Sequence, residues 1–247
     1  MPASTAPAGR RVIVTGATGG IGRAIIESLA ACGCSVAACD APGAPVSEIT
    51  GAAAALAFDV RDREGVQTGV AHAIDQLGGC DAVVANAGIV DTIHRAERFS
   101  DEEWRKDLET NLYGAFYLAQ AAFESLAASG DGRVIVISSV AAEHAIPGQV
   151  AYGASKAGLI GMARTLAAEW ASRGIRCNVI MPGFIATPKV LAMPDPVKEA
   201  AVSGIPLGRF GETDELAGAV SFLLSPAAAY INGAVLRVDG GYGLSLR

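Results

Sequence analysis

The sequence predicts one α/β domain built on a doubly wound parallel sheet of about seven strands, with helices on both faces. Three observations predict it. Short apolar runs alternate with helical patterns along nearly the whole chain, which is typical of strands that crossover helices bury on both faces. The first run leads through a glycine-rich turn into a helical pattern, as in the first unit of a Rossmann-like fold. A length of 247 residues suits one domain of this kind.

Each element follows from a local pattern of apolar residues. Strands are expected at residues 11–14, 35–39, 53–58, 81–85, 133–137, 175–181 and 234–238. Helices are expected at residues 21–32, 62–77, 101–128, 150–173 and 213–224. Residues 41–50 contain prolines and leave room for only a short crossover helix, or none.

The domain organisation is expected to be simple. Residues 1–10 are rich in small residues and read as a flexible tail, and residues 11–247 as a single catalytic domain. Prolines interrupt the helical pattern within 188–208, so this stretch reads as a loop or substrate lid rather than as a core element.

Composition and charge exclude several classes of function. The hydrophobic fraction of 51% argues against disorder, and a net charge of −6 argues against a nucleic-acid partner. No apolar run is long enough to span a bilayer and no signal peptide is evident, so a cytoplasmic protein without a membrane partner is expected. The five cysteines lack the spacing of a metal site, which predicts reduced thiols and no metal.

The glycine-rich turn predicts a dinucleotide site. Gly16 permits a tight turn, Gly20 lets the backbone approach a diphosphate, and Gly22 allows close helix packing. Thr18, Gly19 and Ile21 complete the turn. Asp40 ends the next strand, where a carboxylate binds both ribose hydroxyls and repels a 2′-phosphate, so NAD(H) is the expected cofactor. Asp59 ends the third strand and could contact the adenine. The alternatives are a turn-capping role for Asp40 and a helix-capping role for Asp59.

Tyr152 and Lys156 predict the chemistry. They are spaced i, i+4 and share a helix face, so the ammonium should lower the pKa of the phenol and make it an acid or base near neutral pH. A solvated face is the alternative. Ser138 and Ser139 follow a strand, at the edge where doubly wound folds place their sites, and this favours the catalytic interpretation.

Together these motifs resemble those of the short-chain dehydrogenase/reductases, from residue 11 to residue 241. The resemblance implies that Tyr152 donates or accepts the proton, that Lys156 lowers its pKa and binds the nicotinamide ribose, and that Ser139 polarises the substrate oxygen. Asn111 would hold a water that connects Lys156 to solvent, although it could instead be a polar residue at a helix kink. The further residues implied for the cofactor are Val60, Asn86, Ala87, Gly88, Pro182, Gly183, Ile185 and Thr187.

The substrate is less specified than the reaction. Residues 148–161 and 182–187 resemble the 3-oxoacyl-carrier-protein reductases, so reduction of a carrier-linked or CoA-linked 3-oxoacyl group is the alternative to a small carbonyl or alcohol substrate. Two features depart from that branch, because Asp40 opposes NADP and Gly130 replaces one of two carrier-docking arginines, the other matching Arg173. A catalytically silent NAD-sensing protein is the alternative of another class.

Pocket residues and assembly complete the expectations. His144, Gln149 and Phe184 are candidate substrate contacts, each of which could equally be a loop residue facing water. The resemblance also implies a homotetramer, or a homodimer paired through long helices.

Overall fold

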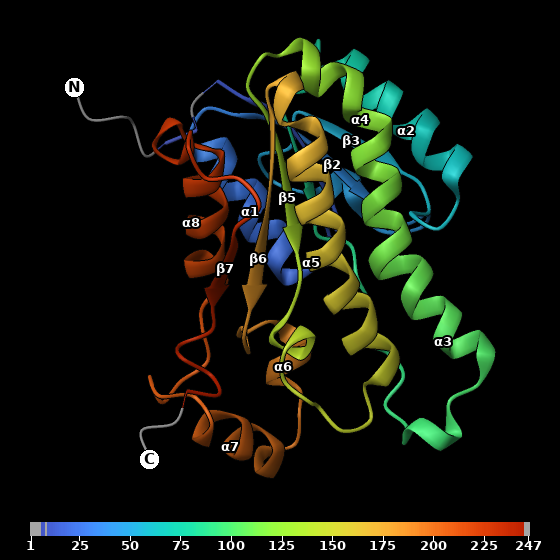
Figure 1. Cartoon of the computed structure of the whole chain (residues 1–247), viewed down its shortest axis with the longest axis vertical. Coiled ribbons are helices and arrows are strands. Elements are labelled where there is room, and N and C mark those ends of the chain that lie inside the picture. The colour runs from blue at the N-terminus through green and yellow to red at the C-terminus, as the bar shows by residue number, and fades with distance from the viewer. Residues whose placement is uncertain (1–5, 8, 245–247) are drawn as a thin grey trace.

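The computed structural model describes residues 6, 7 and 9–244 and confirms the predicted fold class. Seven strands of this part of the chain form one parallel sheet in the order β3-β2-β1-β4-β5-β6-β7 (Figure 1). Their bounds are Arg11–Thr15 for β1, Ser35–Asp40 for β2, Ala54–Ala57 for β3, Ala82–Ala85 for β4, Gly132–Ile137 for β5, Ile175–Pro182 for β6 and Val235–Val238 for β7. The predicted tail lies partly outside the described residues.

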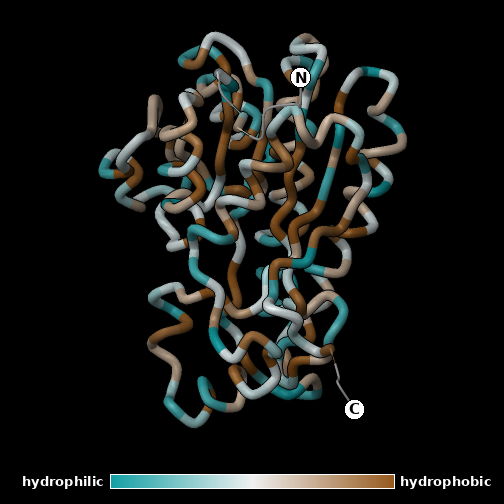
Figure 2. Tube along the Cα trace, turned by 90° about the vertical axis from the view of Figure 1, so that its left-hand side faces the viewer, coloured by the Kyte–Doolittle hydropathy of each residue, from teal (hydrophilic) through white to brown (hydrophobic). Residues whose placement is uncertain are grey.

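Helices cover both faces of the sheet, each over its own apolar core (Figure 1). On one face lie α1 (Gly20–Ala31) and α8 (Thr213–Leu224). On the other lie α2 (Arg63–Leu77), α4 (Gly114–Ala128) and α5 (Val150–Trp170). The hydrophobic strands run through the interior between these layers (Figure 2). The residues buried from water are chiefly aliphatic, which accounts for the apolar runs in the sequence.

The prediction of one continuous helix over residues 101–128 is wrong. It is divided into α3 (Asp101–Leu108), a π-helical turn (Glu109–Tyr113) and α4. The side chain of Asn111 binds the backbone of Ile89 and the hydroxyl of Ser155 at this point. These bonds to two other segments hold the wider turn in place, since such turns interrupt the regular hydrogen-bond ladder.

Three other segments refine the predictions. Residues 188–208 contain two short helices, α6 (Pro188–Leu191) and α7 (Asp195–Ser203), rather than a continuous loop. Residues 41–50 hold only a 3₁₀ turn (Val46–Glu48), as the short connection predicted. The α5 helix ends at Trp170, and a 3₁₀ turn leads to Gly174, whose φ of 73° closes it.

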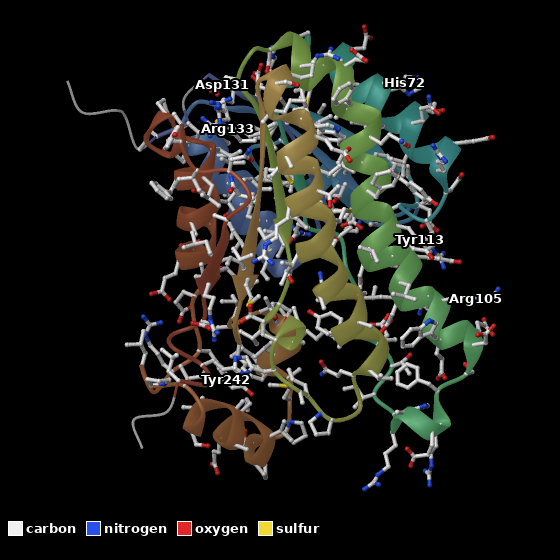
Figure 3. All side chains as sticks on the ribbon, viewed as in Figure 1. His72, Arg105, Tyr113, Asp131, Arg133 and Tyr242 are labelled. Atoms are coloured by element: carbon white, nitrogen blue, oxygen red, sulfur yellow. The ribbon has the colours of Figure 1, made fainter. Side chains whose placement is uncertain are left out.

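The strand ends place the site. Because the sheet is parallel, all carboxyl ends meet at one edge, where α6 and α7 also lie (Figure 1). Tyr242 is at this end of the molecule, whereas Asp131 and Arg133 are at the opposite end (Figure 3). Within the described chain, no helix has the length and apolar character needed to cross a membrane.

Candidate active site

The glycine turn after β1 forms one end of a cavity of about 700 Å³. Gly16 has a φ of +67°, and a Cβ there would lie 2.9 Å from the Cα of Ala87. A Cβ on Gly22 would lie 2.1 Å from the carbonyl oxygen of Gly16, so only glycine lets α1 begin this close to the turn. The first turn of α1 has neither a capping side chain nor an acidic residue. Its free N–H groups therefore suit a diphosphate.

Most of the predicted cofactor residues line this cavity. They are Gly16, Thr18, Gly19, Gly20, Ile21, Gly22, Asp40, Asp59, Val60, Asn86, Ala87, Gly88 and Thr187. The side-chain amide of Asn86 donates to the carbonyls of Thr15 and Gly16, and so fastens the strand end of β4 to the glycine turn.

The two predicted carboxylates differ in their contacts. Asp40 accepts hydrogen bonds from the backbone N–H and the hydroxyl of Thr18, at 2.8 and 2.7 Å, and from the backbone of Ala41. It is therefore fixed at the rim of the cavity, facing the glycine turn. Asp59 is paired with Arg61, whose hydrogen bond is the largest influence that lowers the pKa of Asp59. Asp59 does not cap α2, because Asp62 does.

A second, mainly apolar cavity of about 430 Å³ adjoins the first and shares Ile21, Asn86, Gly88, Ile89, Thr187 and Lys189 with it. Ser139 and Tyr152 line it, as do the predicted residues Lys156, Pro182, Gly183 and Ile185. The two hydroxyls are close enough that a hydrogen bond from Ser139 lowers the pKa of Tyr152. The structure thus brings the predicted polar groups to one wall of an otherwise apolar space, a common form of small-molecule site.

The predicted lowering of the Tyr152 pKa by Lys156 is wrong for this structure. Burial raises the pKa of Tyr152 above 10, and the Ser139 hydrogen bond opposes this only in part. The ammonium of Lys156 donates to the carbonyl of Ile137 at 2.9 Å and lies 5.7 Å from the centre of the tyrosine ring. Burial lowers the pKa of Lys156 itself to about 8, so its ammonium is still mostly charged at pH 7 but loses the proton just above it.

Asn111 lies beside this pair rather than within a cavity. Its amide brackets the backbone of Ile89 through two hydrogen bonds, at 2.7 and 3.0 Å. A Cβ on Gly88 would lie 3.1 Å from the ammonium of Lys156 and 3.2 Å from the Asn111 side-chain oxygen. Asn111 therefore lies at an irregularity in the helix, as the kink alternative proposed. The same π-helical turn brings it next to Gly88 and Ile89.

The three predicted substrate residues separate. Gln149 and Phe184 line the apolar cavity, and His144 does not. The His144 ring packs edge-on against Tyr242 with centroids 5.4 Å apart, and its Nε2 lies 3.2 Å from the Arg237 guanidinium. The chain after β7 folds back over this histidine, which the sequence near Ser139 did not indicate.

Two polar residues at the site were missed. The hydroxyl of Thr15 accepts from the backbone N–H groups of Asn86 and Ala87 and so aligns the two strand ends. Asp107 on α3 is 1% exposed, and neither of its oxygens has a hydrogen-bond partner among the described residues. Burial raises the pKa of Asp107, and its charge raises the pKa of Tyr152. Asp107 stands among charged residues (Asp101, Glu102, Glu103, Arg105 and Lys106), so no signal in the sequence indicated its burial.

Comparisons with known proteins agree with this geometry. The family described as enoyl-(acyl carrier protein) reductase matches residues 16–243. The 3-oxoacyl-acyl-carrier-protein reductase FabG of Haemophilus influenzae is 39% identical over 241 residues, which cover 96% of this chain and 99% of that protein. Nodulation protein G of Azospirillum brasilense is 39% identical over 237 residues, covering 93% and 96%. The crystal structure of gox2181 superposes with a TM-score of 0.90 at 35% identity and covers 95% of each chain.

The chain belongs to the short-chain dehydrogenase/reductase family. It is an oxidoreductase, and proteins of this family use a nicotinamide dinucleotide. The uncapped start of α1, the two glycines without room for a Cβ and the adjoining cavity fit such a cofactor.

Proposed function

We propose that the chain is an NAD(H)-dependent oxidoreductase that interconverts a ketone and a secondary alcohol, with Tyr152 as general acid and base. The main support for this proposal is that the two cavities adjoin. The hydroxyls of Ser139 and Tyr152 line the apolar cavity, which opens beside the one that ends at the glycine turn. When bound there, the nicotinamide supplies or accepts the hydride.

The side chains of the site then stabilise the substrate oxygen and transfer one proton to or from it. As a carbonyl is reduced, negative charge develops on its oxygen, and donors from Ser139 and Tyr152 stabilise that charge increasingly toward the transition state. Tyr152 gives its proton to the oxygen during reduction and removes it during oxidation. Lys156, held by the carbonyl of Ile137, would bind the nicotinamide ribose, and Asn111 would hold the water that connects Lys156 to solvent.

The preference for NAD(H) over NADP(H) rests on Asp40. Its carboxylate is fixed by Thr18 and Ala41 at the end of β2, where the adenine ribose would lie. The carboxylate of Asp40 would repel the 2′-phosphate of NADP(H). Thr18, which donates hydrogen bonds to Asp40, carries no positive charge that would offset this repulsion.

Replacement of Tyr152 by phenylalanine tests the reaction. We expect Tyr152→Phe to lower turnover by about 10²- to 10⁴-fold while NADH binding is unchanged, because only the proton-transfer group is lost. Tyr113→Phe is the matched control, since Tyr113 is 46% exposed and lines neither cavity. Near-normal turnover of the Tyr152 variant would show that another group transfers the proton.

The apolar cavity favours a small or medium-sized apolar ketone or alcohol. Its apolar lining includes Ile93, Val140, Ile146, Phe184, Val190 and Met193. Similarity to the FabG relatives supports the second candidate, a 3-oxoacyl-carrier-protein or -CoA reductase. Two features argue against docking of an acidic carrier protein. The guanidinium of Arg173 stacks on Phe123 and pairs with Glu124, and Gly130 has no side chain that could bind the carrier.

A substrate panel separates these candidates. Cyclic and aromatic ketones should be compared with one 3-oxoacyl group presented as a carrier thioester and as a CoA thioester. Higher kcat/KM for the carrier thioester would establish the second candidate. Tight NADH binding without turnover of any compound would favour an NAD-sensing protein.

The proposal extends to organisation and assembly. We take residues 11–247 as one catalytic domain, with residues 188–208 as its substrate lid, in a cytoplasmic homotetramer or homodimer. The unpaired thiols of all five cysteines support a reducing compartment. Exposed apolar side chains, among them Tyr230 and Leu207, support a partner surface. Sedimentation of the purified protein would give the number of subunits.

A further inference from the structure

Lys189 lies where the two cavities meet, and its contacts differ from those of the predicted cofactor residues. It lines both cavities from α6. Its ammonium donates to the carboxylate of Asp91 at 2.9 Å and to the carbonyl of Val90 at 3.2 Å. Asp91 and Val90 follow β4, so Lys189 bridges two segments that are 98 residues apart in the chain.

The start of α6 lies directly over the glycine turn. A Cβ on Gly20 would be 3.2 Å from the Cδ of Pro188 and 3.2 Å from the Cγ2 of Thr187. Gly20 is the first residue of α1, whose free N–H groups suit a diphosphate. Lys189 is the next residue after Pro188 and its side chain is 63% exposed. An exposed ammonium therefore lines the same cavity as Gly20, where the two negative charges of a diphosphate would enter.

The present partner of Lys189 is shared with a second lysine. The other oxygen of Asp91 lies 3.6 Å from the ammonium of Lys106 on α3. The hydrogen bond from Lys189 is the largest of the influences that lower the pKa of Asp91, so this carboxylate is charged at neutral pH. If Lys189 leaves, Lys106 still compensates the charge of Asp91, which makes exchange of Lys189 to another anion inexpensive.

We propose that Lys189 is a diphosphate-binding residue: its ammonium leaves the carboxylate of Asp91 and binds the diphosphate of the cofactor. Cofactor binding would then change the position of residues that line the substrate cavity. This inference rests on the proposed dinucleotide function. The diphosphate offers two charges in place of one, together with the adjacent N–H groups of α1. When Lys189 turns toward it, Val90 and Asp91 lose the bridge to α6. Because Val90 lines the apolar cavity, cofactor binding would alter the wall that the substrate contacts.

The test measures binding rather than turnover. NADH and ADP-ribose titrations should be compared in the wild type and in Lys189→Met, Lys189→Arg and Lys198→Met. The last is the matched control, because Lys198 on α7 carries the same charge but pairs with Asp195. We expect Lys189→Met to raise the Kd of both ligands about five- to tenfold and to reduce its dependence on salt. Lys189→Arg should restore most of the affinity, and adenosine, which lacks the diphosphate, should bind all these variants alike.

Replacement of Asp91 gives the opposite sign. Asp91→Asn should lower the Kd for NADH, because it releases Lys189, and this gain should vanish in the Asp91→Asn/Lys189→Met double variant. A Kd in Lys189→Met within twofold of the wild type would overturn the proposal, as would an equal loss for adenosine or weaker binding by Asp91→Asn. A wild-type protein that binds no dinucleotide would overturn this inference together with the proposed function. Wild-type binding with an unaffected Lys189 variant would overturn the inference alone.

Discussion

Replacement of Asp107 by asparagine should stabilise the protein at neutral and alkaline pH. The carboxylate is 1% exposed, and its oxygens have no hydrogen-bond partner in the part of the chain that the structure describes. Leaving a buried polar group unsatisfied costs about 1–3 kcal/mol, and more when the group is charged. Asparagine has nearly the same shape but carries no charge. The amide leaves the same buried position without hydrogen-bond partners, so the gain comes from removing the charge. We therefore expect Asp107→Asn to raise the free energy of unfolding at pH 8 by about 1.4 kcal/mol for each pH unit by which burial raises the pKa of Asp107.

The sign of the pH dependence follows from the raised pKa of Asp107. The folded protein holds this proton more tightly than the unfolded chain does, so stability is greatest below the ordinary pKa of 3.8 and falls as the pH rises toward the folded-state value. The Asp107→Asn variant lacks this fall. Its advantage should therefore be small near pH 4 and should grow to a plateau as the pH rises.

Urea unfolding at a series of pH values measures this difference. Asp101→Asn is the control, because Asp101 is on the same helix but its side chain is 79% exposed, and its effect should stay within about 0.5 kcal/mol. The same change should lower the pKa of Tyr152, which the charge of Asp107 raises, and so should shift the alkaline limb of the kcat profile to lower pH. Equal stabilities of variant and wild type at pH 8 would refute the conclusion that Asp107 is a buried, uncompensated charge.

Two further predictions concern the cofactor and the lysine. Asp40→Ala should raise kcat/KM for NADPH at least tenfold and lower it for NADH, since the charge facing the 2′-phosphate is removed; an unchanged ratio between the two cofactors would contradict the role of Asp40. Lys156→Met should abolish most activity and yet stabilise the protein by up to about 3 kcal/mol below pH 8, with the gain shrinking toward pH 10.5, because burial lowers the pKa of Lys156 from 10.5 to about 8. Unfolding curves at pH 7 and pH 10 measure this gain, and a destabilised variant at pH 7 would show that the hydrogen bond to Ile137 outweighs the cost of burying the charge.

The strands could be predicted because a parallel sheet that is buried on both faces leaves a strong pattern. Val12, Ile13 and Val14 in β1 are fully buried, and the other central strands have the same character. The division of residues 101–128 left only a weak signal, since Thr110, Asn111 and Gly114 are poor helix formers and a helix kink was one of the two interpretations of Asn111. What widens the turn at Asn111 is its bonding to Ile89 and Ser155, which lie 22 and 44 residues away. Periodicity reports local burial and carries no information on contacts of that separation.

The site residues also divide into those that local patterns predict and those that depend on contacts between distant segments. Ser139 follows a strand and Tyr152 and Lys156 share one helix, so their meeting required only the parallel topology, which the sequence already predicted. Lys189 and His144 depend on segments that fold back from far along the chain, and their neighbours could not be inferred from position. Asp107 is the most instructive of these residues, because a chain selected only for stability would place an apolar side chain there. Its charge also raises the pKa of Tyr152, away from the near-neutral value that acid–base catalysis favours, so the same residue costs stability and changes the acidity of the site. If Asp107→Asn is more stable and its kcat profile is displaced, both the loss of stability and the raised pKa of Tyr152 come from this one buried charge.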